Sequence, residues 1–280
     1  MQEYAGAEGQ ESGAASIALR LADPAHATRH KVVCRLSPEE ERIARQAAGS
    51  DRAVFSRTDA DLIRALSNSD IHAIVWEFSI RGPRRLPLPE EVVEAAQSIP
   101  LLLLADSRPS SCRGIIALLG SAPDIRLSLR GSGDLERDVS QVIRHPGEPS
   151  AEQTILESLV RCIPPPVLEI VLIAAIVAKR RTSVDRLATL CKCSAGKLRY
   201  RLKVARGPDP RELLGELTSL HVAWRRGQLD WTSKRVAHET GYSDTVALDH
   251  FVRNHAGVGL FAMGNSACFW TLLEDLAGKF

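Results

Sequence analysis

The residues best suited to do chemistry lie between Lys179 and Arg206, where ten side chains are Lys or Arg and one, Asp185, is acidic. Cations at this density create a local positive field, which suits a polyanion far better than an acidic small molecule. The same stretch carries apolar residues at helical spacing, with Leu198 and Leu202 four positions apart. This pattern predicts an amphipathic helix with a basic outer face.

A second, weaker copy of the pattern follows about one-sixth of the chain later. Ala188 is followed by Ser194, and Ala237 is followed at the same spacing by Ser243. In a helix-turn-helix, a small residue lets two helices cross closely, and a hydroxyl then caps the second helix. Two such units in tandem favour a chain that binds double-stranded DNA.

The first unit offers candidates for contact with DNA on the side opposite Leu198 and Leu202. A helix that enters the major groove N-terminus first meets base edges with its early positions. Arg199 is the best candidate for a bidentate contact to guanine. Neighbouring cations would meet phosphates, which supplies affinity and little sequence choice. The candidates of this unit are Ser194, Gly196, Lys197, Arg199, Tyr200, Arg201 and Lys203, among which Lys197, Arg201 and Lys203 are the expected phosphate contacts.

The second unit is poor in cations. Gly241 stands where the turn needs a left-handed backbone. With Leu248 and Val252 buried, an outward Val246 would touch a thymine methyl and Asp249 would accept from cytosine. We therefore expect the first unit to supply most of the affinity and the second to supply register and modest selectivity. The candidates of the second unit are Ser243, Thr245, Val246, Asp249 and His250.

The elements that precede these units alternate between strand and helix. Residues 30–145 contain five apolar runs at strand length, each followed by a helical pattern, which predicts a doubly wound parallel five-stranded sheet. The unbroken apolar run Leu101–Leu104 fits a strand that is buried on both faces. After Pro146 the strand signal disappears, so the fold class is α/β plus all-α.

Composition and charge agree with two unlike halves. Residues 1–150 have a net charge of −3, and residues 151–280 have a net charge of +5. The apolar run Val167–Ala178 is too short to span a bilayer and predicts a buried helix, and no signal peptide is apparent, so a cytoplasmic location is expected. The expected segments are a mobile tail (1–29), an α/β domain (30–145), a linker and connecting helix (146–165), a DNA-binding domain (166–262) and a C-terminal helix (263–280).

Residues from about Val167 to Ala262 resemble the DNA-binding domain of the AraC/XylS family of bacterial transcription regulators. The resemblance implies seven helices, with two recognition helices that enter successive major grooves on one face of bent DNA. The chain departs from the family pattern at Lys192, Tyr200, His250 and Leu260. The matching residues are Leu187, Ala188, Ser194, Leu198, Leu202, Pro210, Ala223, Val236, Ala237, Gly241, Tyr242, Ser243, Asp244, Leu248, Val252, Gly257 and Val258.

The order of elements in residues 31–145 resembles a response-regulator receiver domain. A receiver needs an acidic pair after the first strand, an acceptor Asp at the end of the third and a Lys near the fifth. Here Arg35 and Leu36 end the first strand, Glu77 stands at the acceptor position, and Arg130 follows the fifth. Glu77 is not expected to accept phosphate, and Mg²⁺ has no obvious seat. The resemblance therefore implies a degenerate receiver that serves dimerisation or binds a ligand or protein.

The sequence shows no enzyme signature, and neither a cofactor nor a metal is expected. The favoured function is a transcription regulator that binds double-stranded DNA as a homodimer, with RNA polymerase as a further partner and no membrane. One alternative is a response regulator controlled by phosphorylation. The alternative from another class is an adaptor whose helical units dock a partner protein. DNA binding through several Lys and Arg should weaken steeply with salt, whereas apolar docking should not.

Overall fold

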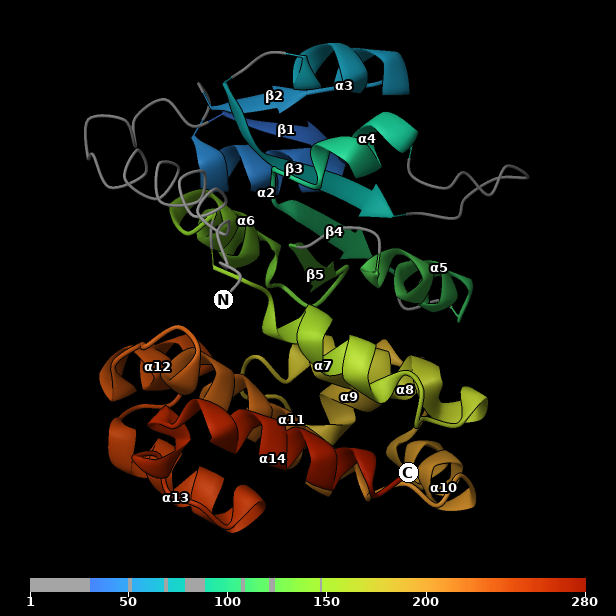
Figure 1. Cartoon of the computed structure of the whole chain (residues 1–280). Coiled ribbons are helices and arrows are strands. Elements are labelled where there is room, and N and C mark those ends of the chain that lie inside the picture. Colours follow the sequence, from blue (N-terminus) through green and yellow to red (C-terminus); the bar gives the residue numbers. More distant parts are fainter. Residues whose placement is uncertain are drawn as a thin grey trace, which may run out of the picture.

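The computed structural model describes residues 31–49, 52–67, 70–78, 89–106, 109–120, 124–146 and 148–280, and the mobile tail predicted at residues 1–29 lies outside them. A sheet with helices on both faces stands above a region of helices alone (Figure 1). The elements of the sheet region are β1 (Lys31–Arg35), α2 (Pro38–Ala48), β2 (Ala53–Phe55), α3 (Asp59–Leu66), β3 (Ile71–Phe78), α4 (Glu90–Ala95), β4 (Leu101–Ala105), α5 (Pro109–Leu119), β5 (Ile125–Leu129) and α6 (Leu135–Arg144). Those of the helical region are α7 (Ala151–Leu159), α8 (Pro165–Val177), α9 (Val184–Leu190), α10 (Ala195–Val204), α11 (Pro210–Gly227), α12 (Ser233–Thr240), α13 (Thr245–Ala256), the short 3₁₀ helix η1 (Ala262–Gly264) and α14 (Ser266–Ala277).

The sheet confirms the predicted fold class. Its five strands are parallel and follow the order β2-β1-β3-β4-β5, which is the receiver-like order. Strand β4 lies between β3 and β5, and all of its residues are buried because helices cover both faces. The run Leu101–Leu104 is therefore apolar at every position because the strand is buried on both faces, as predicted from the sequence.

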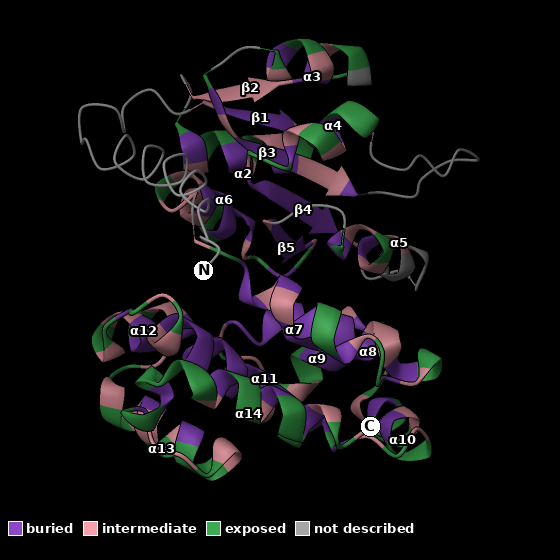
Figure 2. Cartoon of the chain, viewed as in Figure 1, coloured by how far each residue is buried: buried purple, intermediate pink, exposed green. Residues whose placement is uncertain are grey.

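The two faces of the sheet belong to different cores. Alternate residues such as Val32 and Leu102 face α2 and α6 and form a small closed core. The opposite face, with Val33 and Leu103, packs on α3, α4 and α5, and its core continues without a break into the helical region. Helices α7 and α8 both contact β5 and α5, and buried residues run from the sheet into these helices (Figure 2). The helical region and the sheet thus share one core.

Helix α8 is the buried helix that the sequence predicted. Every side chain from Ile170 to Ala178 is at most 2% exposed, so this helix is surrounded on all sides. Helix α11 runs beside it and also contacts α7, α12, α13 and α14. Its Trp224 meets Phe269 of α14 edge to face, with ring centroids 4.9 Å apart. This contact packs the last helix, α14, against α11.

Two helices are shorter than their sequence patterns predict. The pattern of residues 88–99 predicts one helix, but α4 is limited to Glu90–Ala95, because Pro89 stands at its N-cap and the chain then tightens into turns. The last apolar segment, residues 261–280, is divided into η1 and α14. The side chain of Asn265 accepts a hydrogen bond from the Ala267 amide at 3.0 Å, and this cap starts α14 afresh.

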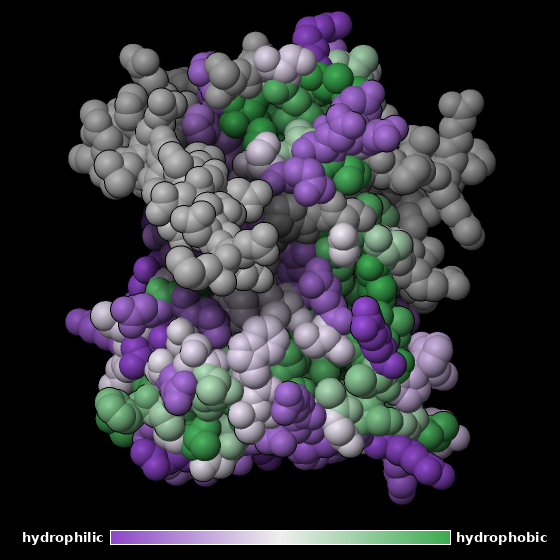
Figure 3. Space-filling view, viewed as in Figure 1, coloured by the Kyte–Doolittle hydropathy of each residue, from purple (hydrophilic) through white to green (hydrophobic). Residues whose placement is uncertain are grey.

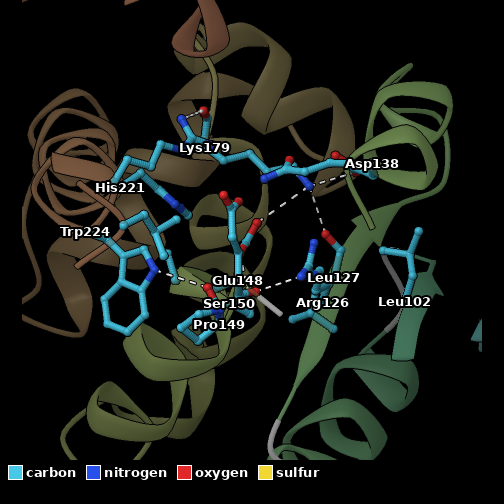
Figure 4. A pocket seen from close by; sticks show the side chains of 15 residues that line it. Leu102, Arg126, Leu127, Asp138, Glu148, Pro149, Ser150, Lys179, His221 and Trp224 are labelled. Atoms are coloured by element: carbon cyan, nitrogen blue, oxygen red, sulfur yellow. Dashed lines mark hydrogen bonds and ion pairs between the residues drawn. The ribbon is translucent and has the colours of Figure 1, made fainter. Parts of the chain in front are cut away.

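The segment between α6 and α7, which was predicted as a linker, is hydrogen-bonded to both regions. Arg126 of β5 donates to the carbonyl oxygens of His145 and Glu148 at 2.6 and 2.7 Å. From the helical side, the indole of Trp224 donates to the Pro149 carbonyl at 3.2 Å and that of Trp231 to the Glu148 carboxylate at 3.1 Å. Figure 4 shows two of these contacts, Arg126 to Glu148 and Trp224 to Pro149. The described part of this segment is therefore held on both sides.

A buried ion pair joins the two regions beside this segment (Figure 4). The ammonium of Lys179, which follows α8, lies 2.7 Å from the Asp138 carboxylate of α6 and 3.6 Å from the Glu152 carboxylate of α7. It also donates to the carbonyl oxygen of Leu127 in β5 at 2.9 Å. The Lys179 side chain is 5% exposed and that of Asp138 is 4% exposed, so the pair is screened from water.

A cavity of about 40 Å³ lies at this junction, and His221 of α11 lines it together with Lys179 and Asp138. One ring nitrogen, Nε2, lies 2.8 Å from the Ala175 carbonyl oxygen. Burial lowers the pKa of His221 to about 4, although the Glu152 charge opposes this shift. Burial alone would raise the pKa of Glu152, but the nearby cations, led by Lys179, lower it to about 2. The imidazole is therefore neutral and the carboxylate charged near neutral pH.

Removal of one partner of the buried pair should destabilise the whole chain. We expect Asp138→Asn to lower the free energy of unfolding by about 3 kcal/mol, because Lys179 loses its nearest charge in a site that water does not reach. Urea unfolding measures this change. Glu136→Gln, at an exposed position of the same helix, is the matched control and should change stability by less than about 0.5 kcal/mol. Equal effects of the two substitutions would contradict the structural role of the pair.

The buried histidine makes stability depend on pH. Between pH 6.5 and about 4 the unfolded chain binds a proton at His221 that the folded chain does not, so stability should fall as the pH falls through this range. The loss attributable to this residue should reach about 3 kcal/mol. His221→Gln should flatten the stability profile in this range, whereas His238→Gln, at an exposed position of α12, should leave it unchanged. Urea unfolding at a series of pH values measures these profiles. Parallel profiles of stability against pH for His221→Gln and the unsubstituted chain would contradict the prediction.

Candidate nucleic-acid interface

The two copies of the sequence pattern fold as two similar helix pairs, α9–α10 and α12–α13. The first helix of each pair begins at a hydroxyl cap. Ser183 accepts a hydrogen bond from the Arg186 amide, and Thr232 accepts one from the Arg235 amide. Helix α11 follows the first pair and leads to the second (Figure 1). The internal repeat therefore extends from the sequence to the local structure.

The same hydrogen-bonded turn ends the first helix of each pair. In the first pair the Cys193 amide donates to the Ala188 carbonyl at 3.0 Å, and in the second the Tyr242 amide donates to the Ala237 carbonyl at 2.9 Å. The turn requires a positive φ, which is 81° at Gly241 and 53° at Lys192. Lys192, at which the chain departs from the AraC/XylS family pattern, therefore occupies the left-handed position of the turn, where a side chain is strained.

Of the two second helices, α10 has the predicted cap and α13 does not. The hydroxyl of Ser194 accepts from the Lys197 amide at 3.2 Å and caps α10, as predicted. The cap predicted at Ser243 is wrong, because the Asp244 carboxylate accepts from the Ala247 amide at 2.8 Å. Ser243 instead donates to the same carboxylate at 3.0 Å. The second turn is one residue longer than the first, and the cap moves one position along.

Helix α10 presents the face that the sequence predicted. Leu198 and Leu202 are fully buried against the rest of the helical region, while Tyr200 is 67% exposed. Arg199 is exposed, and its nearest acidic partner, Asp209, is 3.8 Å away. The exposed residues of the predicted set are Ser194, Gly196, Lys197, Arg199, Tyr200 and Lys203. The structure thus brings these candidates together on one outer surface.

Arg201 is placed differently from the other candidates of α10. Its guanidinium donates to the Pro166 carbonyl at 2.7 Å and lies 3.8 Å from the Glu169 carboxylate, both on α8. The side chain therefore stabilises the packing of α10 on α8. The sequence assigned Arg201 to phosphate because local pattern does not reveal a carboxylate 32 positions away.

Helix α13 also presents most of its predicted face. Leu248 and Val252 are buried, and Val246 is 75% exposed. Thr245 is half-buried and His250 is exposed. These residues leave an outer surface with little charge, as the sequence indicated.

Asp249 of α13 is committed to local structure. One carboxylate oxygen pairs with the Arg253 guanidinium at 2.7 Å, and the other accepts from the Leu260 amide at 2.7 Å. These hydrogen bonds, led by the one from Arg253, lower the pKa of Asp249. The carboxylate thus holds the turn that follows α13. The spacing of Asp249 and Arg253 by four positions was a sequence signal for this pair.

The cations of the basic stretch, residues 179–206, point in two directions. Lys179 pairs with Asp138 of α6, and Arg180 pairs with Asp134, which directly precedes this helix. Arg186 donates to the carbonyl oxygen of Ser132, three residues before α6. The remaining cations, apart from Arg201, are exposed. These remaining exposed cations are Arg181, Lys192, Lys197, Arg199, Lys203 and Arg206. The positive surface therefore belongs mainly to the first helix pair.

The receiver-like site is occupied by the chain's own ion pairs. Glu77, in β3, accepts from the Ser37 amide at 2.6 Å and lies 3.0 Å from the Arg130 guanidinium. Arg130 also makes a bidentate pair with Glu40, at 2.7 and 2.9 Å. The hydrogen bond from Arg130 lowers the pKa of Glu40. A guanidinium thus lies among the carboxylates at this edge of the sheet.

Within the described ranges, no three His, Cys, Asp or Glu side chains come together in a way that suits a metal ion. Among the described helices, none has both the length and the apolar content needed to cross a bilayer. Comparison with models of protein families, with curated proteins and with solved structures gives no match. The geometry of the helix pairs is therefore the main support for a functional interpretation.

The strained turn of the first helix pair leads to a stability prediction. Lys192→Gly should raise the free energy of unfolding by about 0.5–1 kcal/mol, because glycine adopts the positive φ without a clash and loses only part of this gain to chain entropy. The reciprocal change in the second pair, Gly241→Lys, should lower it by a similar amount. Urea unfolding of both variants tests the prediction, and a loss of stability in Lys192→Gly would contradict it.

Proposed function

We propose that this chain is a sequence-specific, DNA-binding transcription regulator. The observation that carries the proposal is the structural repeat: two helix pairs closed by the same backbone turn each present the outer face of their second helix. Helices α10 and α13 lie at the end of the molecule away from the sheet (Figure 1). The resemblance of residues 167–262 to AraC-type regulators supports the same reading, in which the two helices enter successive major grooves.

The two helices have different roles in this proposal. On α10, Arg199 reads guanine, while Lys197 and Lys203 neutralise phosphates. On α13, Val246 and His250 supply register and modest selectivity. In the space-filling view, hydrophilic and apolar side chains are mixed over the visible face of the helical region, and this face has no single large apolar patch (Figure 3).

The α/β domain serves signal input or dimerisation, in keeping with a cytoplasmic regulator that acts as a homodimer and contacts RNA polymerase. Phosphorylation at Glu77 is disfavoured, because both of its carboxylate oxygens are engaged by Ser37 and Arg130. A small molecule or a protein partner is the more suitable signal for a domain of this kind.

Selection of duplexes from random sequence by the full chain, over a series of salt concentrations, tests the proposal. We expect one motif about two helical turns long that is still bound at raised salt. Uniform loss of binding with salt and no motif would reduce the basic face to a nonspecific patch and favour the adaptor function. The full chain is used because α7 and α8 bury their apolar surface against the sheet.

Arg199→Ala should weaken binding to the selected duplex by about 1–3 kcal/mol and relax the choice of base at one position. Arg137→Ala, at an exposed position of α6 in the other domain, is the matched control and should bind like the unsubstituted chain. Titrations monitored by fluorescence anisotropy measure both. An unchanged base preference in Arg199→Ala would show that Arg199 does not contact a base.

A further inference from the structure

A groove of about 710 Å³ lies between the two helix pairs. One wall is α13, with Val246, His250 and Asn254. The opposite wall comprises the connection from α8 to α9, which contains Arg181, and the first half of α11, which contains Arg211. We name it the inter-pair groove. It is formed entirely by the helical region and is separate from the cavity at the junction with the sheet.

The inter-pair groove has the charge of an anion-binding surface. None of its lining residues is Asp or Glu, whereas the junction cavity includes Asp138 and Glu152, and the hollow at the edge of the sheet includes Glu77. Arg181 and Arg211 are both exposed. Across the described ranges, neither guanidinium makes an ion pair with a carboxylate, in contrast to most of the arginines around the junction. Unneutralised guanidinium groups in a concave site favour phosphate.

Other lining groups match a sugar-phosphate strand. On the wall opposite α13, the hydroxyl of Thr182 donates to the Val177 carbonyl at 3.0 Å, so Ser183 and Thr218 are the hydroxyl donors of this wall, and α13 contributes the amide of Asn254. Hydroxyl and amide side chains, together with arginine, are the usual donors to phosphate oxygens in protein–DNA complexes. The groove therefore combines charge with neutral donors along its length.

The groove also has the right position relative to the predicted base contacts. Val246 and His250 line one wall, and both belong to the outer face of α13. The other wall leads to α10, because α11 starts at the Asp209 cap and Asp209 lies 3.8 Å from Arg199. A duplex that places successive major grooves on α10 and α13 must carry its backbone across the space between them.

We propose that the inter-pair groove seats the sugar-phosphate strand of bound DNA between the two major grooves, with Arg181 and Arg211 as its phosphate contacts. This inference rests on the proposed function and adds a binding surface that neither recognition helix supplies alone. It also provides the second helix pair, whose own outer face has few cations, with a source of affinity next to α13.

Arg181 is held in place before any ligand binds. Its amide donates to the Thr240 carbonyl at 2.8 Å, and its guanidinium lies 5.8 Å from the centre of the Tyr242 ring. The two residues before it, Lys179 and Arg180, both pair with the Asp138 carboxylate of α6. The contacts with the α/β domain thus fix the backbone from which Arg181 enters the groove.

The test uses the full chain and the duplex recovered by selection. Arg181→Gln, Arg211→Gln and the double variant are titrated over a series of salt concentrations, with Arg137→Gln as the control. Each groove substitution should reduce the slope of log K against log salt by about 1 and weaken selected and random duplexes alike. Circular dichroism and urea unfolding confirm that the variants are folded. An unchanged slope in the double variant, while the unsubstituted chain binds normally, would overturn the inference and leave the proposed function intact.

A second arm removes charge from the DNA instead of the protein. Neutral methylphosphonate linkages are placed midway between the two halves of the selected site. The unsubstituted chain should lose affinity for this duplex, and the double variant should lose little more, because both changes remove the same contacts. Independent, additive losses would place Arg181 and Arg211 elsewhere on the DNA. Absence of any duplex binding by the unsubstituted chain would remove the proposed function and the inference together.

Discussion

The burial of Lys179 is the constraint on which the arrangement of the two regions depends. A buried ammonium is costly unless charges and hydrogen bonds surround it. Its partners come from three separate elements: Asp138 from α6, Glu152 from α7 and the Leu127 carbonyl from β5. Helix α8, which ends two residues before Lys179, supplies none of them. Neither the sheet nor the helical bundle can therefore satisfy this group without the other.

The apolar packing has the same consequence. Helix α8 is buried on all sides, and one of the surfaces that covers it is the edge of the sheet at β5. A helix of this kind cannot be the outer layer of an independent domain, because water would meet its apolar residues. The junction also explains why three consecutive cations point in two different directions. Lys179 and Arg180 face the sheet region, and Arg181 faces the inter-pair groove.

The sequence predicted those features that depend on local pattern. Leu101–Leu104 indicated a strand covered on both faces, and the spacing of Leu198 and Leu202 gave the correct inner face of α10. It did not predict features that depend on a partner far along the chain. The long side chain of Arg201 reaches α8, and no periodicity distinguishes this from a solvated position. The cap at Asp244 was missed because Ser and Asp are equally good caps, and only the structure shows the extra residue in the second turn.

The edge of the sheet is connected with the first helix pair through one short turn. Arg130 makes the ion pairs with Glu40 and Glu77, and Ser132 and Asp134 follow it two and four residues later. The carbonyl oxygen of Ser132 accepts from Arg186 of α9, and the Asp134 carboxylate pairs with Arg180. The turn is therefore hydrogen-bonded to the helix pair at one end and anchored by the carboxylates of the sheet edge at the other. The turn thus joins the ion pairs at the sheet edge to Arg180, which directly precedes Arg181 in the chain.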